Sequence, residues 1–158
     1  MIAPNQRFTP PHGNASDVLV SKGTAVHSIA PDATVYEAVA RMDQLRVGAL
    51  VVLDGEQRLV GIVSERDYTR KVMLLGRMSR DTRVDEIMTA DVVTVAPSTG
   101  LGDCLRLVTE RRIRHLPVVE SGRVVGMLSI GDLVRACLDQ QAETIQSLNS
   151  FITGGYPQ

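Results

Sequence analysis

The sequence is short of the residue types on which much protein chemistry depends. It has no tryptophan, and aromatic residues make up only 3% of its 158 positions, so there are few side chains on which nucleic-acid bases could stack. Its two cysteines, Cys104 and Cys137, lie in separate apolar segments and match no redox or metal-binding spacing. We expect both to be buried, reduced thiols. The three histidines, His12, His27 and His115, are equally scattered and predict no zinc site.

Excess charge and long apolar runs are also missing. The 17 basic and 18 acidic residues give a net charge of −1, so no overall field draws the chain to DNA or to an anionic membrane. No apolar run has the length of a signal peptide or a membrane span. We therefore expect a cytoplasmic protein without a membrane partner.

What the sequence does contain is an internal repeat. Pro31 recurs 66 positions later as Pro97, and the match continues along the chain with one gap of a single residue. Further matched pairs are Arg46/Arg112, Leu50/Leu116, Val52/Val118, Gly61/Gly126, Ser64/Ser129, Asp67/Asp132 and Arg70/Arg135. An ordered series of this length indicates a duplicated unit.

Each unit predicts the same order of elements. A short strand, over 26–30 or 92–96, ends at a proline, which cannot continue a strand ladder. An amphipathic helix follows, and in the first unit the Thr34 to Glu37 spacing predicts a capping box at its start. Two apolar runs joined by a turn then predict a hairpin, and a closing helix starts at Ser64 or Ser129. The order is therefore β-α-β-β-α, twice.

These patterns predict a mixed α/β fold in which the two units pair through their sheets into one compact module, because strands that are apolar throughout need helices over them. The expected boundaries are a flexible arm over 1–15, a first unit over 16–75, a connection over 76–83, a second unit over 84–140, and a helical extension with tail over 141–158. The last helix should run to Gly154-Gly155. Its apolar stripe needs a partner in this chain or another subunit, and comprises Leu138, Ile145, Leu148 and Ile152.

One motif occurs at the same place in both units. Residues 61–67 and 126–132 each read Gly-apolar-apolar-Ser-x-x-Asp, where a strand meets a helix. A helix start can hold a phosphate, a serine hydroxyl can donate to it, and an aspartate can accept from both hydroxyls of a ribose. The structural alternative is that the serine is an N-cap, the aspartate its partner, and the glycine a close-packing residue. Two copies in register favour the ligand role.

With these motifs and the run from Arg114 to Val119, residues 16–140 resemble the tandem CBS (cystathionine-β-synthase) family, in particular its free-standing bacterial and plant members. The resemblance implies a non-catalytic regulatory protein that forms a homodimer and signals to an unidentified partner. It also implies two quasi-equivalent sites for AMP, ADP or ATP, or for NAD or S-adenosylmethionine. In those sites Ser64 with Asp67 and Ser129 with Asp132 would hold phosphate and ribose, and the bases would lie near Thr24, Val26, Thr89 and Val92.

The two copies differ, so we do not expect equivalent sites. Arg114 and His115 align with glycine and alanine in the first unit, and Arg66 aligns with Gly131 in the second. Arg66, Arg114 and His115 are therefore the candidate phosphate ligands, whereas Arg111 and Arg112 at a helix C-terminus suit solvated surface. The sequence leaves open which repeat's site Arg114 faces.

Two other classes of function compete with nucleotide sensing. An enzyme is disfavoured because the sequence has no Walker lysine, no paired cysteines and no nucleophile–base set. A nucleic-acid surface could use a basic run with few intervening acids, formed by Arg66, Arg70, Lys71, Arg77, Arg80 and Arg83.

Overall fold

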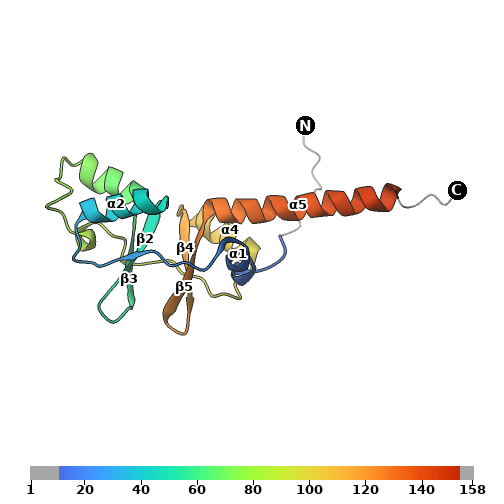
Figure 1. Cartoon of the computed structure of the whole chain (residues 1–158), viewed down its shortest axis with the longest axis horizontal. Helices are drawn as coiled ribbons and strands as arrows, with labels where there is room; N and C mark the ends of the chain where they lie inside the picture. Colours follow the sequence, from blue (N-terminus) through green and yellow to red (C-terminus); the bar gives the residue numbers. More distant parts are fainter. Residues whose placement is uncertain (1–10, 154–158) are drawn as a thin grey trace.

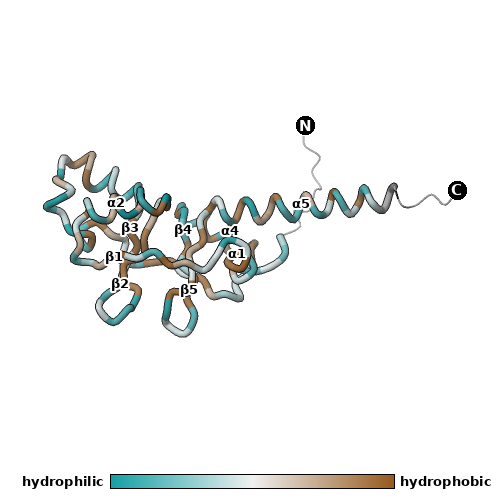
Figure 2. Tube along the Cα trace, viewed as in Figure 1, coloured by the Kyte–Doolittle hydropathy of each residue, from teal (hydrophilic) through white to brown (hydrophobic). Residues whose placement is uncertain are grey.

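The computed structural model describes the backbone of residues 11–153 and the side chains of residues 11–150. The hairpins of the two repeats stand side by side, and the long C-terminal helix projects away from them (Figure 1). Apolar segments gather where strands meet helices, whereas the hairpin tips are polar (Figure 2). In the described part of the chain, no helix is both long and apolar enough to cross a membrane.

The first repeat forms a three-stranded sheet with helices. Its strands are β1 (Ser28–Ile29), β2 (Ala49–Leu53) and β3 (Leu59–Ser64), with β1 parallel and β3 antiparallel to the central β2. α2 (Val35–Leu45) begins at the predicted capping box, in which the Thr34 amide donates to the Glu37 carboxylate at 2.7 Å. The closing helix is irregular, because α3 (Glu65–Tyr68) passes directly into a π-helical turn, η1 (Thr69–Met73).

The second repeat has the same order of elements. α4 (Leu101–Glu110) is followed by the antiparallel strands β4 (His115–Glu120) and β5 (Arg123–Ser129). α5 (Ile130–Thr153) then runs without a break for 24 residues, which confirms the prediction of a long last helix. Both repeats are therefore mixed α/β units, as the sequence predicts.

The opening strands are shorter than predicted. β1 keeps two residues of the strand predicted over 26–30. The strand predicted over 92–96 is reduced to one parallel bridge between Val95 and Val118. The backbone just before that bridge cannot run along β4, because Thr89 is already hydrogen bonded in both directions to β3 of the first repeat.

The two repeats exchange their N-terminal segments. α1 (Ala15–Lys22), a helix not predicted from the sequence, belongs by sequence to the first repeat but packs in the core of the second. The 3-10 turn η2 (Val84–Glu86) does the reverse and packs in the first core. Two amides of each segment donate to the loop that follows the opening strand of the other repeat: Ala15 to Thr99 (2.8 Å), Ser16 to Pro97 (2.9 Å), Val84 to Ala33 (2.8 Å) and Asp85 to Pro31 (2.9 Å). Since Pro31 and Pro97 are repeat equivalents, the internal symmetry relates the two crossings.

The arm predicted over residues 1–15 is too long. Asn14 caps α1 by accepting a hydrogen bond of 3.1 Å from the Asp17 amide, and Ala15 is fully buried in the second core. The His12 amide donates to the Gln140 side chain of α5 at 2.9 Å. The sequence analysis missed this order because the apolar contacts of α1 are with residues far along the chain. Positions 1–10 lie outside the described residues.

Close packing of the exchanged segments explains the two motif glycines. A Cβ added to Gly126 of β5 would lie 2.6 Å from Leu19 of α1, and one added to Gly61 of β3 would fall against the Met88 sulfur. Neither position has room for a side chain unless the segment moves. The two motif glycines are therefore close-packing residues, as the structural alternative in the sequence analysis predicts.

Each repeat has its own core. The first is built around Met42, Leu50 and Ile87, and the second around Leu116 and Leu133. The thiols of both cysteines are free; Cys104 is buried in the second core, whereas Cys137 is only half-buried beside it. Burial raises the pKa of both thiols, which keeps them protonated and unreactive at neutral pH.

Candidate functional site

A cleft of about 380 Å³ opens where the Ser-x-x-Asp motif of the first repeat faces the second repeat. We call it cleft 1, and its volume is within the range of small-molecule sites. The start of β4 closes it opposite β3 and α3. It brings together seven of the residues predicted from the sequence: Ser64, Arg66, Asp67, Thr89, Val92, Arg114 and His115.

A capping box holds Ser64 and Asp67 in place. The amide and the hydroxyl of Ser64 both donate to one carboxylate oxygen of Asp67 at 2.9 Å, and the Asp67 amide donates back to the hydroxyl at 3.3 Å. The other carboxylate oxygen forms an ion pair of 2.9 Å with Lys71. The capping role of the structural alternative is thus present. Both side chains still line cleft 1, so the cap fixes their position at its wall.

A second cleft, of about 450 Å³, lies on the other side of the junction and contains the second motif. We call it cleft 2. Ser129 and Asp132 line it, and their capping box repeats the first, with the Ser129 amide donating to Asp132 at 2.8 Å. The remaining lining comes from the N-terminal segment and from the first repeat: Lys22, Gly23, Ala25, His27, Arg46, Val47, Gly48 and Ala49, with His115 and Met127 of the second repeat.

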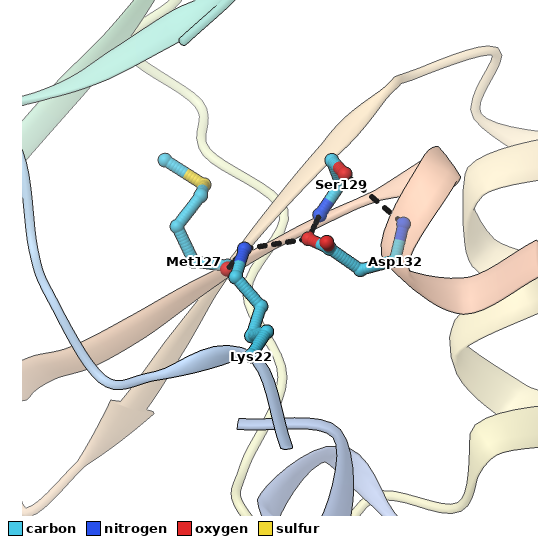
Figure 3. A network of polar contacts seen from close by, with 4 residues as sticks. All are labelled: Lys22, Met127, Ser129 and Asp132. Atoms are coloured by element: carbon cyan, nitrogen blue, oxygen red, sulfur yellow. Dashed lines mark hydrogen bonds and ion pairs between the residues drawn. The ribbon is translucent and has the colours of Figure 1, made fainter. Parts of the chain in front are cut away.

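Lys22, at the end of α1, places a cation in cleft 2. Its ammonium donates to the Asp132 carboxylate at 2.5 Å and to the Met127 carbonyl at 2.6 Å (Figure 3). Burial raises the pKa of Asp132, but hydrogen bonds from Lys22 and Ser129 outweigh burial and hold it below its ordinary value. The carboxylate is therefore charged at neutral pH, as an acceptor of two ribose hydroxyls must be.

The Lys22 ammonium donates a hydrogen bond that a backbone amide donates in the other repeat. Ile62 and Met127 are repeat equivalents, and the Ile62 carbonyl accepts a hydrogen bond of 2.9 Å from the Thr89 amide. At Met127 the lysine ammonium takes the place of that amide. Sequence reasoning missed Lys22, although the 66-residue offset aligns it with Met88, so a charge in place of an apolar residue was the available signal.

His115 lies between the two clefts and lines both of them, as Gly48 does. A Cβ on Gly48 would lie 3.5 Å from the imidazole, in ordinary van der Waals contact, so the ring packs close to the Gly48 backbone. Burial lowers the pKa of His115, and the charges of Lys22 and Arg114 lower it further against the opposing effect of Asp132. The imidazole is therefore neutral at pH 7.

The structure answers one question that the sequence left open. Arg114 lines cleft 1 and so faces the motif of the other repeat. Gly23, Ala25 and His27 line cleft 2, and Thr24 and Val26 lie between them in the chain. That the base lies near Thr24 and Val26 stays a prediction.

The basic run considered as a nucleic-acid surface is largely engaged within the chain. Most of its cations have a partner there: Lys71 with Asp67, Arg77 with Glu86 at 2.6 Å, Arg83 with Asp85 at 2.5 Å, Arg66 with the Arg112 carbonyl at 3.2 Å, and Arg80 with the Tyr36 ring at 3.7 Å. These contacts reduce the free positive charge that phosphate backbones would require.

Comparison with known proteins agrees with the two-repeat architecture. A model of the CBS domain family matches residues 15–74 and 84–139. The CBS domain-containing protein CBSX3, mitochondrial, of Arabidopsis thaliana is 46% identical over 149 residues, covering 89% of this chain and 72% of that protein. YhcV, a CBS domain-containing protein of Bacillus subtilis, is 33% identical over 118 residues, covering 75% of this chain and 83% of that protein.

Among solved structures, a proposed signal-transduction protein with CBS domains from Burkholderia ambifaria is 42% identical, with a TM-score of 0.78 over 82% of this chain and 96% of that chain. Both motifs, and all the residues that line the two clefts, lie within the matched ranges. The chain therefore belongs to the CBS domain family and carries two copies of its repeat.

Proposed function

We propose that this chain is a non-catalytic regulatory protein that binds an adenine nucleotide in each of its two clefts and signals the bound state to a partner protein. One observation carries the proposal: both clefts present a Ser–Asp pair beside cationic side chains at the junction of the repeats. Each carboxylate would accept from the ribose hydroxyls, and the cations would hold the phosphate. The family's regulatory members support a signalling role over a catalytic one.

The charge of the lining argues for different ligands in the two clefts. Cleft 1 has five basic and three acidic side chains, namely Arg66, Arg70, Lys71, Arg112 and Arg114 against Glu65, Asp67 and Asp91. Cleft 2 has two basic side chains, Lys22 and Arg46, and one acidic, Asp132. A larger number of cations suits a larger phosphate charge. We therefore assign ATP or ADP to cleft 1 and AMP to cleft 2, with NAD and S-adenosylmethionine as the competing ligands.

The proposal includes a homodimer and a cytoplasmic location. Exposed apolar side chains occur at or after each Ser-x-x-Asp motif, on Met73, Leu74 and Leu75 in the first repeat and on Ile130, Val134 and Leu138 in the second. We propose these side chains as contacts of the homodimer. Two Arabidopsis relatives are named as mitochondrial and chloroplastic proteins, so cell fractionation is the test of the cytoplasmic location.

Calorimetric titration of matched variants tests nucleotide binding. In Asp67→Asn and Asp132→Asn the amide oxygen can still accept the capping hydrogen bond, but no carboxylate is left for the ribose. The loss of such a hydrogen bond costs about 1–3 kcal/mol, which is roughly a five- to 150-fold loss of affinity. Asp43→Asn makes the same change at an exposed residue of α2 away from both clefts, and so serves as the control.

We expect two binding events in the wild type, with Asp67→Asn weakening the ATP site and Asp132→Asn weakening the AMP site. Each variant also loses one ion pair, Asp67 with Lys71 or Asp132 with Lys22, so its unliganded melting temperature should fall by only a few degrees, and the ligand role is measured by the loss of affinity in the folded variant. Absence of heat with AMP, ADP, ATP, NAD and S-adenosylmethionine at millimolar concentration would refute the proposal.

A further inference from the structure

The part of α5 beyond the family repeat has an unusual surface. The family match ends at residue 139, but the helix continues to Thr153 and projects from the module (Figure 1). Every residue from 141 to 150 is exposed, including Ile145 at 59% and Leu148 at 57%. An isolated helix of this length is marginal in water, so an extension of this kind is expected to pack against a partner.

The exposed apolar side chains follow a heptad. With Leu138 as position a, Ile145 is the next a, and Val134, Gln141 and Leu148 occupy the d positions. The a and d apolar residues are exposed, Val134 at 46% and Leu138 at 59%, whereas the fully buried Leu133 is at position c. The module thus covers one side of α5 and leaves the a/d seam outward. Spacing of 3.5 residues is the pattern of a coiled coil, not of a helix lying on a flat core.

We propose that this seam pairs with the same seam of a second copy of the chain, forming a parallel, in-register, two-stranded coiled coil. A second copy suits the seam because the positions beside it are nearly uncharged, and Gln141 determines the orientation. In a parallel pair each d residue faces its own counterpart, so Gln141 meets Gln141 and the two amides can bond one another. In an antiparallel pair d faces a, and Gln141 would meet Leu138 or Ile145, which cannot bond its amide.

Side chains beside the seam are compatible with this pairing. The e and g positions from 135 to 149 are Arg135, Cys137, Ala142, Thr144 and Asn149, of which only the first is charged. The acidic residues Asp139 and Glu143 fall at b and f, away from the seam, so like charges do not meet. In the last heptad, Ile145 at a with Leu148 at d is the combination that favours two strands. The pairing goes beyond the proposed function because it requires no nucleotide.

Cysteine cross-linking of the full-length chain tests orientation and register together. In a Cys137→Ser background, Leu148→Cys places the two thiols in one layer of the parallel coil, within disulfide reach. In the antiparallel alignment, residue 148 lies opposite residue 138, so the two cysteines are ten residues, or about 15 Å, apart along the axis. Ser147→Cys, at the outward c position, is the matched control.

We expect mild oxidation to convert most of the Leu148→Cys protein to a covalent dimer and little of the Ser147→Cys protein. Adding Ile145→Lys to the Leu148→Cys protein should abolish the cross-link, whereas adding Gln146→Lys, at an outward b position, should leave it intact. Equal cross-linking of positions 147 and 148 would overturn the proposal, as would a monomer of the full-length chain at tens of micromolar in sedimentation velocity. A monomer would also contradict the homodimer of the proposed function, whereas a dimer without the expected cross-link overturns the coiled coil alone, and neither result depends on nucleotide binding.

Discussion

The bond between Lys22 and Asp132 should be measurable as a coupling free energy between the N-terminal helix and the last helix. Lys22→Met keeps the length of the side chain but removes the ammonium that bonds both the Asp132 carboxylate and the Met127 carbonyl. One third of the Lys22 side chain is exposed (33%), so solvent screens part of the interaction. We therefore expect a coupling of about 1 kcal/mol in a double-mutant cycle with Asp132→Asn.

The free energy of unfolding of the single Lys22→Met variant should fall by somewhat more than this coupling, because the Met127 carbonyl also loses its donor. A total of about 1–2 kcal/mol corresponds to a fall in melting temperature of roughly 2–8 °C for a chain of this size. Urea denaturation and thermal unfolding at pH 7 measure both quantities. Arg123→Met, at an exposed position at the start of β5, controls for the loss of a positive charge.

The pH dependence follows from the direction of the pKa shift. The folded state lowers the pKa of Asp132 below 3.8, so the unfolded state binds the proton more readily. The resulting stability is fully present above the unfolded value and is lost as the pH falls through the folded one. The difference between wild type and Lys22→Met should therefore be constant from pH 7 to pH 5 and shrink below pH 4. Equal stability of the two proteins at pH 7, or a difference unchanged in strong acid, would refute the reasoning.

Three further predictions concern packing and ligand coupling. Gly126→Ala and Gly61→Ala should each lower the free energy of unfolding by about 1–3 kcal/mol in urea titrations, because the added methyl overlaps an exchanged segment, whereas Gly55→Ala, which meets no atom within 4 Å, should be near neutral. Leu19→Ala should cost about 2–5 kcal/mol, and hydrogen exchange should report faster opening of both repeats; an effect confined to α1 would contradict this. Bound phosphate should favour protonated His115, so nucleotide affinity should rise as the pH falls below 6.5 in the wild type and stay flat in His115→Gln, as measured by calorimetry.

Local patterns in the sequence were sufficient for much of the fold. The capping box at Thr34, the apolar runs of the hairpins and the uninterrupted stripe of α5 all act between residues close in the chain, and the structure contains each of them. The offset of the repeat also aligned Ser64 with Ser129, and the structure places both at clefts. These features could be predicted because near neighbours determine them.

Other features depend on which distant segments meet. α1 was missed, although Asn14 and Asp17 have the spacing of a capping box, because its apolar face packs in the core of the second repeat, which no local pattern reveals. The side of the extended segment that faces cleft 2 depends on how the segment runs between α1 and β1, so the sequence did not predict that Gly23, Ala25 and His27 line the cleft. Lys22 acts in a cleft whose other lining residues fall in 23–27, 46–49 and 115–132, most of them distant in the sequence.

The exchange of N-terminal segments bears on how such a chain could have arisen. If a gene for one repeat is duplicated, the single-repeat product must already have been able to fold. A lone repeat could not place its own N-terminal segment in its own core in this geometry, because each segment reaches the sheet of the other repeat. The simplest ancestor is therefore a homodimer in which two copies swapped these segments, and fusion of the two genes made the swap intramolecular. On that view the two clefts descend from one site at a symmetric interface, and Lys22 and His115 record the divergence of its halves after fusion.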